Sequence, residues 1–294
     1  MSESTNSFGS AVGWIGALAA PESDDAVKSI RHIAALAAYE AHCWEFEHRE
    51  TLMKALDRGL PVPALSSAGA DEPHWTRYLS YLLDPQMPHG LGGSLGRCLL
   101  THLTGESSHD VIRVYSPAYL GSECATCKHG LEIDFVLASE RTLVACEMKT
   151  KRQTGLSNSS CTACGSQLET YSLAISNGAL DEWYRGHYFI NPPTPKYLFL
   201  TPGGKRGSDW LSMSYQQLSE VLLGLLCETR SAVAQYNLTA LLFDLSFVSG
   251  DGWTVPIRKL AALLKCTSPL DPNQALTLAC LRDDNPILFA LLLR

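Results

Sequence analysis

The feature that most constrains the fold is a stretch with two apolar runs, LEIDFVLA (131–138) and TLVACEM (142–148), separated by a short polar break. Runs of this length bounded by polar residues indicate buried strands. The first run contains Asp134, the second contains Glu147, and Lys149 follows directly. Charged residues are rarely buried unless they are paired, so their presence here requires a chemical explanation.

The spacing of the two runs predicts how these charges meet. Side chains alternate along a strand, so Glu147 and Lys149 share one face. A two-residue turn at positions 140–141 would place Asp134 opposite Glu147, although Glu-Arg is not a preferred hairpin turn.

Two facing carboxylates repel each other, and Lys149 supplies only one positive charge. A divalent cation would supply the rest, and carboxylate ligands suit Mg²⁺ or Mn²⁺. A solvated sheet face with ordinary ion pairs is the alternative, and periodicity alone does not choose between the two.

Composition limits the possible classes of protein. The 294 residues, 46% of them hydrophobic, are enough to bury a substantial core. A formal net charge of -7 and a pI near 5.7 argue against nucleic-acid binding through overall charge, but they leave room for a local basic groove. The sequence has no run of about 18 apolar residues, so we expect no membrane span.

The cysteines indicate a reducing compartment. The apolar segment AVGWIGALAAP (11–21) is short and lacks a basic flank, so we expect no secretory signal. The ten cysteines are therefore expected to be thiols or metal ligands in the cytoplasm rather than disulfides.

Local signals divide the chain into four parts. Residues 1–22 predict a disordered or mobile arm, and 23–70 predict a helical segment with a Pro/Gly/Ser linker. Residues 71–225 contain the strand patterns, and 226–294 predict a helical extension packed on that core.

Helix and strand boundaries follow from individual residues. Pro73 suits a first helical turn and Pro85 ends that helix. Ser-x-x-Glu at 166–169 and Ser-x-x-Gln at 214–217 have the spacing of capping boxes, and 196–202 predicts a buried strand.

Five stretches occur in a recognisable order. EPHWTRYLSYLLDPQMPHGLG (72–92) comes first, followed by Asp134, twelve intervening residues and Glu147-Met148-Lys149. GSQLETYSLAI (165–175), KYLFLTPGG (196–204) and WLSMSYQQLSEVL (210–222) complete the series. Together they resemble the glutamate helix with its HGLG loop, the D…(D/E)xK motif, the QLxxY helix and the final strand and helix of one bacterial branch of the PD-(D/E)XK nuclease superfamily.

The resemblance covers residues 72–225. It implies an α/β (α+β) fold with a restriction-endonuclease-like core, in which helices flank a central mixed β-sheet (αβββαβ). Helical additions would lie at the N- and C-terminal ends.

The same resemblance implies a metal-dependent active site. Asp134, Glu147 and the backbone carbonyl of Met148 would hold Mg²⁺ or Mn²⁺, and Glu72 would support the metal or its water from the far side. Lys149 would polarise the attacking water and stabilise charge on the phosphate. The implied reaction is phosphodiester hydrolysis, because the metal lowers the pKa of bound water.

Three more residues belong to the compared motifs. Gln167, in the first turn of its predicted helix, matches the orienting glutamine of the family. Tyr171 is expected to share the face of Gln167 and to pack rather than react. His89 is expected to pack in its loop or to contact phosphate, because the family pattern gives it no role as general base.

Two CxxC pairs, Cys124 with Cys127 and Cys161 with Cys164, are separated by 33 residues. Two such pairs can complete a tetrahedral site for structural Zn²⁺. An iron–sulfur cluster is the main alternative, because four cysteines also hold such clusters, and a redox dithiol is a third. The pairs flank the predicted hairpin, where the compared branch usually has short loops.

Nucleic acid is the expected partner, and the apolar C-terminal helices could bind a protein or a second copy of the chain. Local positive charge could contact phosphates without reading bases. The basic residues concerned are Lys128, His129, Lys149, Lys151, Arg152, Lys205 and Arg206. For the last two an ordinary solvated charge cluster fits equally well.

Two functions remain open. The first is a metal-dependent nuclease, with DNA favoured over RNA, for which the resemblance suggests bacterial restriction or antiviral defence. The second is an inactive nuclease-fold protein that serves as a zinc-stabilised module for binding nucleic acid or protein. Glu72, Asp134, Glu147 and Lys149 are all present, which favours the enzyme, because an inactive copy has no reason to keep all four.

The zinc site can be tested directly. Cys161→Ser should lower thermal stability, because metal binding contributes to folding, and should lower activity by loosening the helix that begins near Gln167. The requirement for Mg²⁺ should not change. Elemental analysis of the native protein should find about one zinc per chain. Iron with acid-labile sulfide would instead indicate a cluster, and protein without metal would contradict the site.

Overall fold

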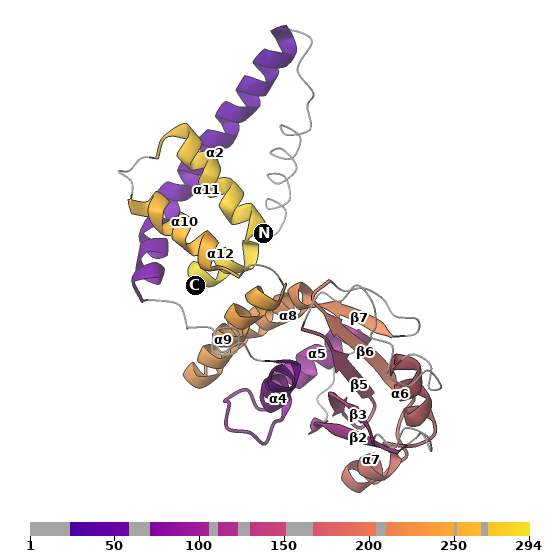
Figure 1. Ribbon diagram of the computed structural model, residues 1–294. Coiled ribbons are helices and arrows are strands. Elements are labelled where there is room, and N and C mark those ends of the chain that lie inside the picture. The colour runs from indigo at the N-terminus through magenta and orange to yellow at the C-terminus, as the bar shows by residue number, and fades with distance from the viewer. Residues whose placement is uncertain are drawn as a thin grey trace. The chain divides into compact units, whose positions relative to one another are not determined.

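Figure 1 shows the computed structural model, which describes residues 24–58, 71–105, 111–122, 130–150, 167–203, 210–249, 252–265 and 270–294. The chain divides into two compact units, one formed by residues up to 60 together with 253–294, and the other by residues 61–252. The predicted arm at 1–22 and the four cysteines of the predicted zinc site lie outside the described residues.

The larger unit contains a five-stranded mixed sheet with the strand order β1-β4-β5-β6-β7. Its strands are β1 (Arg113–Tyr115), β4 (Phe135–Ala138), β5 (Leu143–Met148), β6 (Lys196–Thr201) and β7 (Leu211–Ser214). The pairs β1–β4 and β4–β5 are antiparallel, whereas β5–β6 and β6–β7 are parallel. The predicted mixed α/β class, with a central sheet flanked by helices, is therefore confirmed.

The hairpin register between β4 and β5 agrees with the prediction. Phe135 pairs with Cys146, and the amide of Ser139 donates to the carbonyl of Thr142 at 2.8 Å across a turn at positions 140–141. The Tyr184 hydroxyl contacts the carbonyl oxygens of Ser139 at 2.8 Å and of Glu140 at 3.0 Å. These contacts stabilise a turn whose own residues do not favour it.

The pattern of the first apolar run predicts one continuous strand. The structure instead has two strands, because the chain bends at Asp134. Strand β3 (Gly130–Ile133) ends before this residue and pairs with β2 (Ala118–Ser122) in a separate two-stranded sheet, while β4 begins after it. The carbonyl of Asp134 accepts a hydrogen bond from the hydroxyl of Ser116 at 2.8 Å. A side-chain contact of this kind holds a bend that strand periodicity does not encode.

The described residues of the larger unit form the helices α4 (Glu72–Leu83), α5 (Ser94–Thr104), α6 (Gln167–Ser176), α7 (Asp181–Tyr188), α8 (Tyr215–Glu228) and α9 (Ala232–Ser249). In Figure 1, α6 and α7 lie on one side of the sheet, and α4, α5 and α8 lie on the other. Pro73 stands in the first turn of α4, and a capping box of Ser214 and Gln217 begins α8, both as predicted.

The smaller unit is helical. It contains α2 (Asp24–Arg58), α10 (Thr254–Lys265), α11 (Pro272–Asp284) and α12 (Pro286–Leu292). The expected C-terminal extension, 226–294, is therefore divided, because α9 belongs to the sheet unit while α10–α12 cluster with α2. In the described parts of both units, no helix is long and apolar enough to cross a membrane.

Close packing of α5 gives a test of the fold. A Cβ atom on Gly96 would lie 2.8 Å from Cγ2 of the buried Ile112, which precedes β1. Gly96→Ala should therefore lower the free energy of unfolding by about 1–2 kcal/mol, measured by urea denaturation. Gly224→Ala is the matched control, because nothing lies within 4 Å of its Cβ position, and it should be neutral or stabilising. Similar effects of both changes would contradict the packing.

Candidate metal centre

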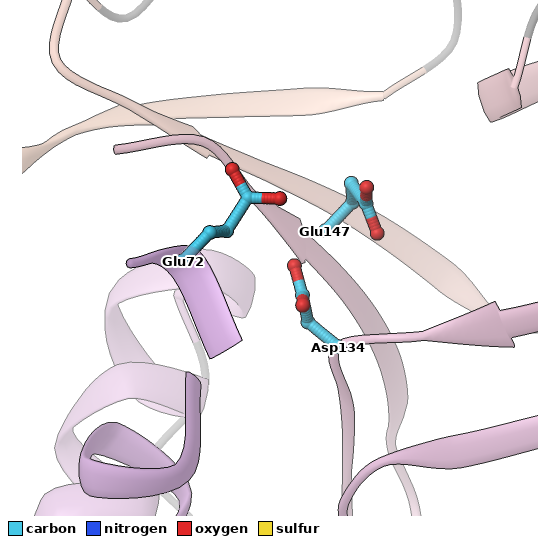
Figure 2. A group of neighbouring side chains, drawn as sticks. All are labelled: Glu72, Asp134 and Glu147. Atoms are coloured by element: carbon cyan, nitrogen blue, oxygen red, sulfur yellow. The ribbon is translucent and has the colours of Figure 1, made fainter. Parts of the chain in front are cut away.

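Three acidic side chains from distant parts of the sequence meet at one place. Glu72 comes from the first residue of α4, Asp134 from the bend between β3 and β4, and Glu147 from β5. One carboxylate oxygen of each lies within 4.8 Å of the others, and Figure 2 shows the three carboxyl groups around a common space. The convergence predicted for these three residues is confirmed.

Lys149 joins two of the three acids. Its Nζ atom lies 2.8 Å from Oε1 of Glu72 and 2.6 Å from Oε1 of Glu147. The lysine side chain is 14% exposed and that of Glu147 is 4% exposed, so water screens their ion pair only weakly. The predicted position of Lys149 beside the carboxylates is therefore confirmed.

Main-chain contacts hold Lys149 at the end of β5. Its amide donates to the carbonyl of Leu200 in β6 at 2.9 Å, which continues the parallel ladder by one residue. Its own carbonyl accepts a hydrogen bond from the buried Tyr215 hydroxyl at 3.0 Å. The ammonium group therefore extends from a fixed backbone.

The carboxylate of Asp134 is held at both oxygens. The Thr76 hydroxyl donates to Oδ1 at 2.9 Å, and the backbone amide of Met148 donates to Oδ2 at 2.7 Å. The resemblance implies that the carbonyl of Met148 binds the metal. The contact found in the structure is made by the amide of Met148, which donates to Asp134. These two donors fix the orientation of the carboxylate relative to Glu147.

Burial and like charge oppose ionisation of the acids. Burial raises the pKa of Asp134 against the effect of its hydrogen bonds. Burial, followed by repulsion from Asp134, raises the pKa of Glu147. Burial disfavours the charge on Lys149, but its ion pairs with Glu147 and Glu72 outweigh this effect and raise its pKa. Added positive charge would relieve the repulsion that remains between the acids.

Gln167 and Tyr171 form a pair on α6. The amide nitrogen of Gln167 donates to the Tyr171 hydroxyl at 2.7 Å, and the Tyr171 ring is buried in the core between the sheet and α6. Burial, with a smaller contribution from Glu147, raises the pKa of Tyr171 to about 12. Tyr171 therefore packs, as predicted. The contact found for the Gln167 amide is with this tyrosine, so the orienting role of Gln167 beside the carboxylates stays a prediction.

His89 has a structural role in the loop after α4. It is fully buried, its Nε2 lies 2.7 Å from the carbonyl of Asp84, and its Nδ1 accepts from the amide of Leu91 at 3.0 Å. Loop packing is thus the correct one of the two roles predicted for it. The proposed phosphate-binding residues other than Lys149 lie outside the described ranges.

Sequence reasoning missed Thr76, Ser116 and Tyr215. Thr76 follows Glu72 by four residues, and this helical spacing is a signal that could have identified it. The hydroxyls of Ser116 and Tyr215 donate to the backbone carbonyls of Asp134 and Lys149. The sequence contains no comparable signal for these contacts.

Comparison of the chain with protein-family models, with curated proteins and with solved structures found no match in any of the three. The fit of a metal therefore depends on the donor atoms themselves. Three clustered carboxylates are hard oxygen ligands, which suit Mg²⁺ or Mn²⁺ better than a soft metal. The cluster thus fits the predicted Mg²⁺ or Mn²⁺.

The Lys149 ion pairs can be tested by stability measurements in EDTA. Lys149→Met should lower the free energy of unfolding by roughly 3 kcal/mol, because the buried Glu147 carboxylate loses its partner and must stay unpaired or take up a proton. Adding Mg²⁺ should recover part of the loss. A Lys149→Met/Glu147→Gln double variant should lose less than the single variant, because the unpaired charge is gone.

Lys54→Met on α2 is the control for this experiment. Lys54 pairs with Glu50 at 2.5 Å, but their side chains are 61% and 82% exposed. Solvent screens such a pair, so its loss should leave the unfolding free energy almost unchanged. Equal losses in the two lysine variants would show that the Lys149 pairs do not stabilise the fold.

Proposed function

We propose that this protein is a metal-dependent nuclease that hydrolyses phosphodiester bonds. The observation that carries the proposal is the convergence of Glu72, Asp134 and Glu147 around Lys149 at the end of β5. Isolated acidic clusters are common on protein surfaces, but this one is partly buried, includes a lysine and comes from three separate elements.

The order of elements supports a PD-(D/E)XK-like core. Helix α4 precedes the antiparallel strands β1, β4 and β5, and α6 and α7 then lead to β6, which pairs parallel with β5. This sequence of helix, strands, helix and strand is similar to the core expected from the motifs. The acids lie where the motifs of that superfamily would place them, at the bend before β4 and at the end of β5.

The side chains suggest a division of labour. When bound, Mg²⁺ or Mn²⁺ would lower the pKa of a coordinated water and neutralise charge on the phosphate. Asp134 and Glu147 would hold the metal, with Glu72 and the Met148 carbonyl as further oxygen donors. The Lys149 ammonium would orient the attacking water and stabilise the negative charge that develops on the phosphate.

DNA is the proposed substrate, and restriction or antiviral defence is the proposed setting, both by analogy with the resembling branch. The net charge of -7 means that binding would depend on local basic residues near the hairpin. A zinc ion on the four CxxC cysteines would stabilise the segments that flank this hairpin.

Cleavage assays test the proposal. Purified protein should nick or degrade plasmid or linear DNA with Mg²⁺ or Mn²⁺ but not with EDTA. Asp134→Ala and Lys149→Ala should each lower the rate by at least about 100-fold, because each removes a group that stabilises the transition state. RNA tested in parallel would establish the substrate class.

Matched variants exclude general effects of substitution. Asp181→Ala and Lys54→Ala remove exposed charges outside the candidate site and should retain full activity. Cleavage that persists in Asp134→Ala protein free of contaminating nuclease would refute the assignment. A protein that binds DNA with no cleavage under any metal condition would favour the inactive binding module.

A further inference from the structure

Thr76 is a buried hydroxyl on the face of α4 that meets the Asp134 bend. It is 5% exposed and lies one helical turn after Glu72 and one turn before Ser80, so the three residues share a face. A buried hydroxyl is costly unless it is hydrogen bonded. The Thr76 hydroxyl meets this requirement by donating to Oδ1 of Asp134 at 2.9 Å.

The backbone at Asp134 is held separately from its carboxylate. The Ser80 hydroxyl donates to that of Ser116 at 2.8 Å, and the Ser116 hydroxyl donates to the Asp134 carbonyl at 2.8 Å. The bend therefore has support that does not pass through Thr76. Loss of the Thr76 hydroxyl would remove the donor to Oδ1 and leave the carboxylate held only by the Met148 amide at Oδ2, while these contacts still hold the chain.

We propose that Thr76 is a positioning residue that orients the Asp134 carboxylate for a divalent cation, an inference that rests on the cation site of the proposed function. The Met148 amide fixes Oδ2, and the Thr76 hydroxyl fixes Oδ1. Together they restrict rotation of the carboxylate, which has an oxygen within 4.8 Å of carboxylate oxygens of Glu72 and Glu147. Residues that orient metal ligands in this way strongly affect metal affinity.

Binding of Mn²⁺ to the full chain, followed by electron paramagnetic resonance, tests the role without reliance on catalysis. Thr76→Val keeps the shape of the side chain and removes the hydroxyl, so Mn²⁺ affinity should fall roughly 10-fold or more. Thr76→Ser restores the hydroxyl and should restore most of the affinity. Asp134→Ala identifies the binding event that belongs to this site.

Thr104→Val is the matched control. The Thr104 hydroxyl donates to the carbonyl of Leu100 within α5 at 2.8 Å, so this variant makes the same chemical change without touching Asp134. It should bind Mn²⁺ as the wild type does. Thermal unfolding of each variant checks the fold, and Thr76→Ala takes the place of the valine variant if valine is not tolerated.

The outcomes separate the two proposals. If the wild type binds Mn²⁺ through Asp134 but Thr76→Val binds equally well, Thr76 has no positioning role and the proposed function stands. Equal weakening in Thr76→Val and Thr76→Ser would also overturn the role, because a hydroxyl would then not suffice. A wild type with no Mn²⁺ binding that depends on Asp134 would refute the proposed metal site and, with it, the role of Thr76.

Discussion

The ion pairs of Lys149 with Glu72 and Glu147 are the contact on which the site depends, because they join the end of β5 to the start of α4. Three acids held this close together repel, and burial adds a further cost. The lysine offsets part of that cost only if its backbone is fixed. Pairing of its amide with Leu200 and of its carbonyl with Tyr215 provides that support from β6 and α8.

Helix α4 serves the core and the site with two adjacent faces. Trp75, Leu79 and Leu82 are buried apolar residues, whereas Thr76 and Ser80 are buried hydroxyls that contact or support the Asp134 bend. Packing of the apolar face sets the position of the helix, and the polar face then determines where the carboxylates lie. The cluster therefore depends on the same helix packing that stabilises the sheet unit.

Local chemistry explains which features the sequence could predict. The first turn of α4 and the cap of α8 depend on neighbouring residues, and the local pattern predicts both. The β4–β5 register follows from the spacing of the two apolar runs, although its turn is also held by the distant Tyr184. The bend at Asp134 depends on α4 and Ser116, which lie far away in sequence, so periodicity predicted one continuous strand. The apolar face of a helix shows that the helix packs, but it does not show against which element. The sequence therefore did not predict that 226–294 is divided between the two units.

Charge balance links the geometry of the cluster to its chemistry. If all three acids are ionised, the single ammonium leaves them with two uncompensated negative charges. Burial makes that state costly, so either protons or a cation must supply positive charge. Protonation would remove oxygen donors, whereas one divalent cation would neutralise the group and keep every carboxylate charged. The charge balance is therefore compatible with the divalent cation that the proposed function requires.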